Sequence, residues 1–425
     1  MPKKKILLYY LVLFVILLGW KNADTPPAIP LRLAFLVALV FPGLREKNAL
    51  IPAALICFWG VASNGYAYTY MPYTTYIYTI IVLLAVILNR GKNKPVQLPE
   101  KSYLWFFFSF ITIVNFCTQF GIDNLSHTLL ISILFFYLIS EGDQNAINLI
   151  ECSFIFMTIG ISIFSLSARE QILLESISYD INSERVAWVD PNYLGVQVGM
   201  GAVIALFKLF DKQTSSLAIK IISILSIILA LPTIFMTGSR GAVLCVAIAF
   251  LVLFSVTDTK IWIKLFIIIA IIAFCVYLYT NDYFDLFLER VQNDDGSGSG
   301  RLDIWTKKID AFNHDGNILN YLFGFGSLGG MMLGYYHYQG FHNDYLSFLC
   351  SFGIVGLFLF LYYFFLPYKL VNKKSFTKYK VISGLAFLAV SMLTLEPFGL
   401  GIFTFYAFIA YLLLLAKYSC AFVKY

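Results

Sequence analysis

Apolar runs of bilayer-spanning length recur along almost the whole chain and are separated by short polar stretches. A transmembrane helix needs about 20 consecutive, mainly apolar residues. Charged residues make up only 13% of the chain, about half of their usual share in soluble domains, and the mean hydropathy is +0.78. The sequence therefore predicts an all-α fold, a polytopic membrane helix bundle.

The predicted bundle has about 12 to 14 transmembrane helices, because two of the fourteen apolar runs, 29–43 and 126–140, are short. The fourteen runs are 5–20, 29–43, 49–63, 73–89, 102–119, 126–140, 146–166, 191–210, 218–236, 240–256, 261–280, 342–366, 379–395 and 398–416. The first run follows Lys3–Lys5 and lacks a small-residue cleavage site, so it is predicted to be a retained helix. An even number of spans places both termini on one side of the membrane.

Lysine and arginine in short loops predict which side each loop faces, since cytoplasmic loops carry an excess of both. The loop that follows the run 342–366 has five lysines and no acid before Val381. The segment 281–341 has eight acids against four bases. Charge and parity together predict a cytoplasmic N-terminus and place 281–341 outside, as a large extracytoplasmic loop before the twelfth span. The net charge of +6 comes from basic residues between apolar runs, so no nucleic-acid partner is predicted.

Four basic or titratable residues meet on the predicted outer face: Arg185, Arg240, Arg301 and His342. An arginine at a membrane edge is costly unless it is paired or binds an anion. Snorkelling or a local ion pair is the plainer explanation for any one of them, but it explains three arginines on one face less well. Arginine forks fit phosphate oxygens, and the helix that starts at Gly241 adds backbone amides for an anion.

His342 opens the twelfth predicted span and is the candidate general base. A near-neutral pKa suits histidine to remove a proton from a hydroxyl, and Asn343 or Asp344 could fix its tautomer. The plainer reading is a helix cap or an interfacial residue. The seven cysteines are scattered and no Cys or Glu completes a ligand set with His337, so neither a disulfide framework nor a metal site is predicted.

Glycine pairs in the outer segment, Gly324 with Gly326 and Gly329 with Gly330, are interpreted as tight loop turns. No strand precedes them, so a nucleotide cradle is not indicated. Asp294-Asp295-Gly296 has no further carboxylates at the spacing of a calcium loop, which favours a solvated loop.

Motifs in a fixed order then connect the chain to a known family. They are Asp190-Pro191-Asn192, Ser239-Arg240-Gly241, Arg301-Leu302-Asp303-Ile304-Trp305, Leu322-Phe323-Gly324-Phe325-Gly326, His342-Asn343-Asp344-Tyr345-Leu346 and Gly353-Ile354-Val355-Gly356-Leu357. With these motifs the chain resembles the O-antigen ligase and O-antigen polymerase superfamily of bacterial surface-glycan enzymes. The division that follows is 1–184 for N-terminal transmembrane helices, 185–366 for a catalytic region that includes the outer loop 281–341, and 367–425 for C-terminal transmembrane helices.

The resemblance implies a metal-independent glycosyltransferase of the bacterial inner membrane without a cofactor. Its donor is an oligosaccharide on undecaprenyl pyrophosphate, its acceptor is a glycan hydroxyl on the periplasmic face, and a chain-length regulator is a further expected partner besides the bilayer. By the resemblance Arg240 and Arg301 bind the pyrophosphate and His342 is the base; Arg185 is added as a third anion ligand. The family's polymerases have about ten residues between an outer-loop arginine and the glycine that follows it, whereas nine residues separate Arg185 from Gly195 and Arg290 from Gly300.

Three functions remain as alternatives. Polymerisation of repeat units in O-antigen, capsule or exopolysaccharide synthesis is favoured; a ligase that transfers glycan to lipid A core or to protein differs only in the acceptor. A transporter of lipid-linked glycans is the alternative from another class. Transporters place charges in broken helices near the bilayer midplane, and the nearest candidate, Glu396 beside Pro397, is predicted at the outer edge.

Overall fold

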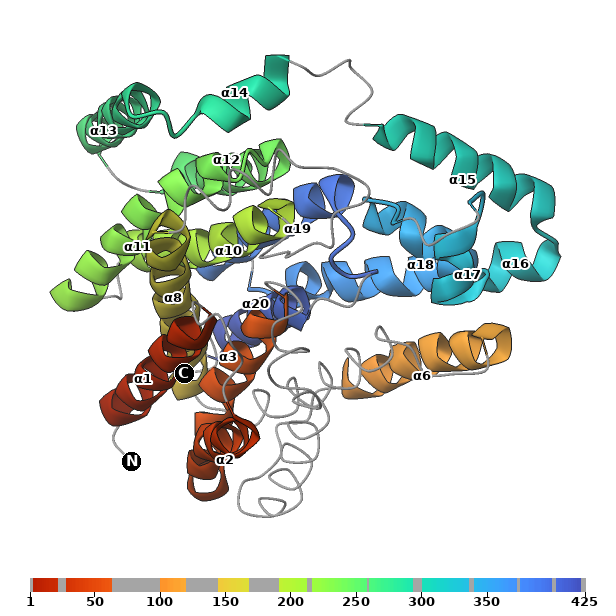
Figure 1. Ribbon diagram of the computed structural model, residues 1–425, viewed down its shortest axis with the longest axis horizontal. Coiled ribbons are helices and arrows are strands. Elements are labelled where there is room, and N and C mark those ends of the chain that lie inside the picture. The colour runs from red at the N-terminus through yellow and green to blue at the C-terminus, as the bar shows by residue number, and fades with distance from the viewer. Residues whose placement is uncertain are drawn as a thin grey trace.

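The computed structural model describes the helical parts of the chain, and no strand occurs among the residues it describes (Figure 1). These residues are 3–21, 28–62, 100–119, 144–167, 191–211, 216–257, 260–292, 300–335, 340–372, 375–399 and 403–421. The predicted spans 73–89 and 126–140 and the candidate ligand Arg185 lie outside these ranges. The all-α prediction is confirmed.

Helix positions follow the apolar runs closely. The runs 191–210, 240–256 and 261–280 coincide with α10 (Pro191–Phe210), α12 (Arg240–Val256) and α13 (Ile261–Thr280). The other long helices are α1 (Lys3–Lys21), α2 (Ile29–Arg45), α3 (Leu50–Ala62), α6 (Glu100–Gln119), α8 (Gln144–Ser167), α11 (Leu217–Met236), α18 (Asp344–Leu370), α19 (Thr377–Thr394) and α20 (Phe403–Ala421). A single 3₁₀ turn, η1 (Lys47–Ala49), precedes α3.

Several of these helices have the apolar character of membrane spans. Four described helices are both long and apolar enough to cross a bilayer: Ala146–Ser167, Asn192–Phe210, Leu217–Met236 and Asp344–Leu370. Shorter apolar helices add to them, and α13 exposes Trp262, Phe266 and Ile269 as a lipid-facing helix does. The protein is therefore a multi-pass membrane protein.

The central helix is α10, which packs against α8, α11, α12 and α19. Small residues make this possible, because they let neighbouring backbones approach closely. A methyl group at Gly201 would lie inside contact distance of Thr158 in α8, and one at Gly199 would touch Val246 of α12 and Phe387 of α19. The hydrophobic core is thus built around α10.

Two buried ion pairs mark one end of the bundle. Lys208, near the end of α10, pairs with Glu151 of α8, whose other oxygen accepts the Tyr411 hydroxyl at 2.8 Å. Lys380, in the first turn of α19, pairs with Asp211 at 2.6 Å. Because successive helices run in opposite directions, the other end of the bundle carries the starts of α10, α12 and α18 and the end of α19.

The outer segment is largely helical. It contains α14 (Asp285–Gln292), α15 (Arg301–Asp315), α16 (Ile318–Phe323) and α17 (Gly326–Met332), and Figure 1 shows the last three beside one end of α18. Local sequence sets the ends: a capping box of Asn317 and Asn320 starts α16. Gly324 and Gly326 have positive φ and form turns as predicted, whereas Gly329 and Gly330 lie inside α17, so the predicted second turn is wrong.

Helix α18 breaks at Gly353, where φ is 66° and ψ is −171°. The end of α16 fits into this break: a Cβ at Gly353 would lie 2.3 Å from the carbonyl carbon of Leu322, and one at Gly324 would lie 2.2 Å from that of Ser351. The amide of Phe325 donates to the Cys350 carbonyl at 3.0 Å, which is near the break. The outer segment is therefore joined to α18 by backbone contact.

Candidate functional site

His342 lies immediately before α18 in a left-handed backbone conformation, with a φ of 50°. This conformation costs a non-glycine residue roughly 1–2 kcal/mol, so surrounding contacts must hold it. The side chain is half-buried. Its own amide donates to Glu396 Oε2 at 3.0 Å, and the amide of Phe341 donates to the same oxygen at 2.5 Å.

Glu396 is completely buried in the turn that follows α19. Burial raises the pKa of this carboxyl to about 7, although Ser347, the two backbone amides and the Lys308 cation each lower it. The Glu396 amide itself donates to the Tyr193 hydroxyl of α10 at 3.4 Å. Sequence reasoning placed Glu396 at this end but gave it no part in the site; a lone acid beside a proline between two apolar runs was the signal.

Phe341 is fully buried and is held from three sides. The indole nitrogen of Trp305 donates to its carbonyl at 2.7 Å, Glu396 accepts its amide, and the Lys308 Nζ lies 4.2 Å from the centre of its ring. We call Trp305, Lys308 and Glu396 the Phe341 clasp. The clasp binds both the amide and the carbonyl of Phe341, the residue before His342. It therefore fixes the position of the backbone that leads into His342.

Lys308 is buried inside the outer segment, on the inner face of α15. Its ammonium group donates to the carbonyls of Gly330, Met331 and Leu333 at 3.1, 2.8 and 3.4 Å, at the end of α17. Burial lowers the pKa of Lys308 to about 8, although Glu396 and Cys350 act in the opposite direction. In the sequence Lys308 stands out only as one of the four bases of the segment.

Arg301 begins α15 directly after Gly300, which has a φ of 78°. Residues three or four apart lie on one helix face, and Arg301, Trp305 and Lys308 have this spacing. The exposed pair of Asp303 and Lys307, 2.8 Å apart, lies on another face. Arg301 therefore stands one turn from the clasp, at a helix start whose amides attract anions.

Arg240 is the first residue of α12, and the side chain of Ser239 caps that helix by accepting the Ala242 amide at 3.3 Å. The next residue, Gly241, packs against α19: a Cβ there would lie 2.7 Å from Thr394 Oγ1. Thr394 is two residues from Glu396, which binds the His342 amide. The structure thus brings the predicted residues Arg240 and His342 to the same end of the bundle through the end of α19.

Asn343 and Asp344, predicted to support His342, both hold backbone groups. Asn343 Oδ1 accepts the Leu346 amide at 3.1 Å and caps α18. The two oxygens of Asp344 accept the amides of Gly399 and Phe398 at 2.7 and 3.2 Å. These bonds join the start of α18 to the Glu396 turn. An orienting effect on the imidazole of His342 stays a prediction.

An apolar groove of about 570 Å³ lies behind the clasp, between α15, α16 and α18. Ile309, Phe312, Tyr321, Leu349 and Ile354 are among its lining residues. Phe312 and Cys350 line the groove and also pack with Phe341 in one cluster. An apolar ligand in the groove would therefore lie next to the residues that pack against Phe341, the residue before His342.

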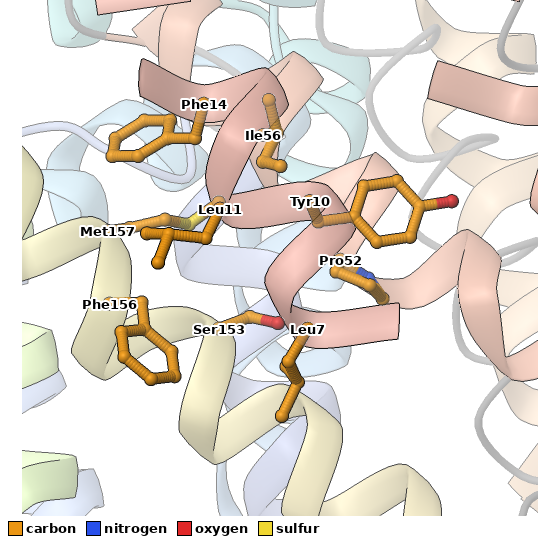
Figure 2. Close-up of a pocket in the computed structure, with 9 residues that line it drawn as sticks. All are labelled: Leu7, Tyr10, Leu11, Phe14, Pro52, Ile56, Ser153, Phe156 and Met157. Atoms are coloured by element: carbon orange, nitrogen blue, oxygen red, sulfur yellow. The ribbon is translucent and has the colours of Figure 1, made fainter. Parts of the chain in front are cut away.

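A second pocket, in another part of the bundle, is small and has no charged side chain in its lining. Its volume is about 20 Å³. Mainly apolar side chains of α1, α3 and α8 line it (Figure 2). Its hydroxyl groups are those of Ser153 and of Tyr10, which donates to the Leu39 carbonyl at 2.9 Å. Among the described ranges there is also no group of three or more metal-ligating His, Cys, Asp or Glu side chains.

Comparison with known proteins supports the sequence motifs. Residues 225–361 match the model of the O-antigen ligase family. The matched segment runs from α11 into α18 and contains Arg240, Arg301 and His342, while Glu396 lies beyond it. A comparison with curated proteins finds no match.

Proposed function

Because the chain contains a domain of the O-antigen ligase and polymerase superfamily, a family of glycan-transferring membrane proteins, we propose that it transfers an oligosaccharide from undecaprenyl pyrophosphate to a glycan hydroxyl. The reaction takes place on the periplasmic face of the bacterial inner membrane. The observation that carries the proposal is the fixed backbone of His342, at the same end of the bundle as Arg240. The preceding residue, Phe341, is bound by Trp305, which lies one helical turn after Arg301 in α15.

In the proposed reaction the imidazole of His342 takes the proton of the acceptor hydroxyl. The acceptor oxygen attacks the anomeric carbon of the donor sugar, and the bond from that carbon to the pyrophosphate oxygen breaks. The leaving undecaprenyl pyrophosphate keeps the bonding electron pair. A neutral histidine within hydrogen-bond reach suits this proton transfer.

Arginines supply the positive charge that the leaving group needs. Arg240 and Arg301 each begin a helix, so each guanidinium stands beside backbone amides that favour the same anion. Electrostatic stabilisation of this kind can lower the barrier without a metal ion. We accordingly propose a metal-independent mechanism, with Arg185 as a third ligand.

The groove behind the clasp fits the lipid part of the donor. Its lining is apolar, and it adjoins α18 near the predicted outer edge of the membrane. A carrier lipid must reach the site sideways from the bilayer, so an apolar path toward the site is required. The bilayer, the lipid-linked donor and the glycan acceptor are therefore the proposed partners, with a chain-length regulator as a further one.

Polymerisation of repeat units is the acceptor reaction we favour, because the spacings from Arg185 to Gly195 and from Arg290 to Gly300 come within one residue of the pattern in the family's polymerases. The family match carries the name of the ligase reaction, so transfer to lipid A core is the second candidate. A lipid-linked glycan transporter gains less support, since the buried charges Glu151 and Lys208 are paired with one another.

The test uses purified protein with lipid-pyrophosphate repeat units, with and without a lipid A core acceptor, and with chelator throughout. The expected product is a ladder of repeat units, with one lipid pyrophosphate released for each bond formed. Product only on lipid A core would identify a ligase. Loss of activity on chelation would contradict the metal-free mechanism, and movement of donor across vesicles without transfer would contradict the proposal.

A further inference from the structure

The Lys308 side chain is an unusual component for a buried position next to the site. Its exposed fraction is zero, and its neighbours are backbone carbonyls and the rings of Phe341 and Tyr335. A buried cation is unfavourable unless hydrogen bonds and opposite charge compensate for lost hydration. An apolar side chain of similar length would fill the same volume without that cost, so packing alone does not account for a lysine.

The contacts of Lys308 join three parts of the outer segment. It belongs to α15, it binds carbonyls at the end of α17, and its cation lies over the ring of Phe341, one residue before His342. Trp305, one turn earlier on the same face, binds the Phe341 carbonyl. Helix α15 therefore holds the backbone that precedes His342 by a side-chain contact and a backbone contact at once.

We propose that Lys308 and Trp305 are positioning residues for the reaction, which set the left-handed conformation of His342 through Phe341. The inference rests on the proposed function. It also connects the two halves of the site, because Arg301 is on the same face of α15 as both residues. Helix α15 would thereby set the position of a donor bound at Arg301 relative to the proposed base, His342.

The geometry predicts a loss of rate rather than of donor binding. Positioning errors of about 1 Å at a reacting group can lower a rate on the order of 100-fold. Lys308→Met keeps the length of the side chain and removes the cation, so it should lower kcat on the order of 10- to 100-fold and leave the Kd for the donor within about 2-fold. Arg240 and Arg301, which bind the donor's charge, are untouched.

Lys307→Met is the matched control. Lys307 is the neighbouring residue of the same helix, but it is exposed and pairs with Asp303 on the surface. Its substitution should leave kcat unchanged. Trp305→Phe is a milder second variant, which keeps an aromatic ring and removes only the donor to the Phe341 carbonyl; it guards against a Lys308 variant that fails to fold.

Amide hydrogen exchange measures the clasp without reference to catalysis. In the full-length wild-type protein the amides of Phe341 and His342, both bound to Glu396, should exchange slowly. They should exchange at least about 10-fold faster in Lys308→Met and Trp305→Phe, but not in Lys307→Met. If the wild type transfers no glycan while exchange changes as stated, the proposed function is contradicted. The conclusion that Lys308 and Trp305 fix the backbone at Phe341 and His342 would still hold.

Three results would overturn the inference. Unchanged exchange at Phe341 and His342 in both folded variants would show that Lys308 and Trp305 do not fix this backbone. Faster exchange together with wild-type kcat would show that the backbone they fix does not matter for transfer. A loss of donor binding equal to the loss of kcat would likewise contradict a positioning role.

Discussion

Substitution of Glu396 by glutamine tests the buried carboxylate at the centre of the clasp. Burial raises its pKa from 4.5 to about 7, so between these pH values the folded protein binds a proton that the unfolded chain releases. Stability from this group is then fully present below about pH 4.5 and is lost as pH rises through 7. At about 1.4 kcal/mol per pKa unit, the loss amounts to about 3 kcal/mol.

Glutamine keeps an oxygen that accepts the amides of Phe341 and His342 but does not titrate. The unfolding free energy, measured in detergent from pH 4.5 to 8, should therefore fall by about 3 kcal/mol more in the wild type than in Glu396→Gln. Asp310→Asn, a change at an exposed carboxylate of α15, serves as the control and should behave as the wild type. Equal pH dependence in wild type and Glu396→Gln, or a wild type that gains relative stability as pH rises, would refute the reasoning.

Three further predictions concern the donor site, the break in α18 and the topology. Arg240→Lys and Arg301→Lys should each lower transfer by roughly 10²- to 10³-fold at unchanged protein level, because an ammonium lacks the guanidinium fork; full activity of the double variant in a transfer assay would argue against anion binding. Gly353→Ala should lower the unfolding free energy by more than about 2 kcal/mol, since φ is 66° and the new Cβ would meet backbone of α16; a denaturation midpoint equal to the wild type would contradict this. In a cysteine-free background, a cysteine at His314 should react with an impermeant maleimide from the periplasm and one at Lys369 only after permeabilisation; the reverse pattern would invert the proposed orientation.

Hydropathy was sufficient to locate most of the membrane helices. The ends of α10, α12 and α13 coincide with the ends of apolar runs. Pro191, Arg240 and Lys260 stand at or directly before the start of each run. Arg240, Arg301 and His342 were also accessible from sequence, since each begins a short motif of polar residues next to an apolar run.

The residues that hold the site in place could not be predicted from the sequence in the same way. Trp305 and Glu396 bind Phe341 across 36 and 55 residues of sequence. Lys308 binds carbonyls that lie 22 to 25 residues away. Nothing in local periodicity indicates such contacts, because they depend on how α15 and the turn after α19 pack against the start of α18. The break at Gly353 was not predicted for the same reason, because it accommodates the end of α16.

The helices of the outer segment show a related limit. The sequence marked 281–341 by its charge, but the four helices α14 to α17 inside it were not predicted. Short helices gain little from local propensity and depend on tertiary contacts. In this segment the tertiary contacts of α15, α16 and α17 are with α18. The sequence predicted α18 as a membrane span but did not predict these contacts.

The most direct measurement of the central claim compares His342→Ala with His314→Ala in transfer and in donor binding. His314 is an exposed histidine of α15 whose Nδ1 lies 2.8 Å from the exposed carboxylate of Asp315, so its loss should leave both properties near wild type. His342→Ala should abolish transfer of the lipid-linked glycan while the donor still binds, because the arginines hold its charge. Transfer near the wild-type rate in His342→Ala, with folded protein and intact donor binding, would contradict the assignment of His342 as the base.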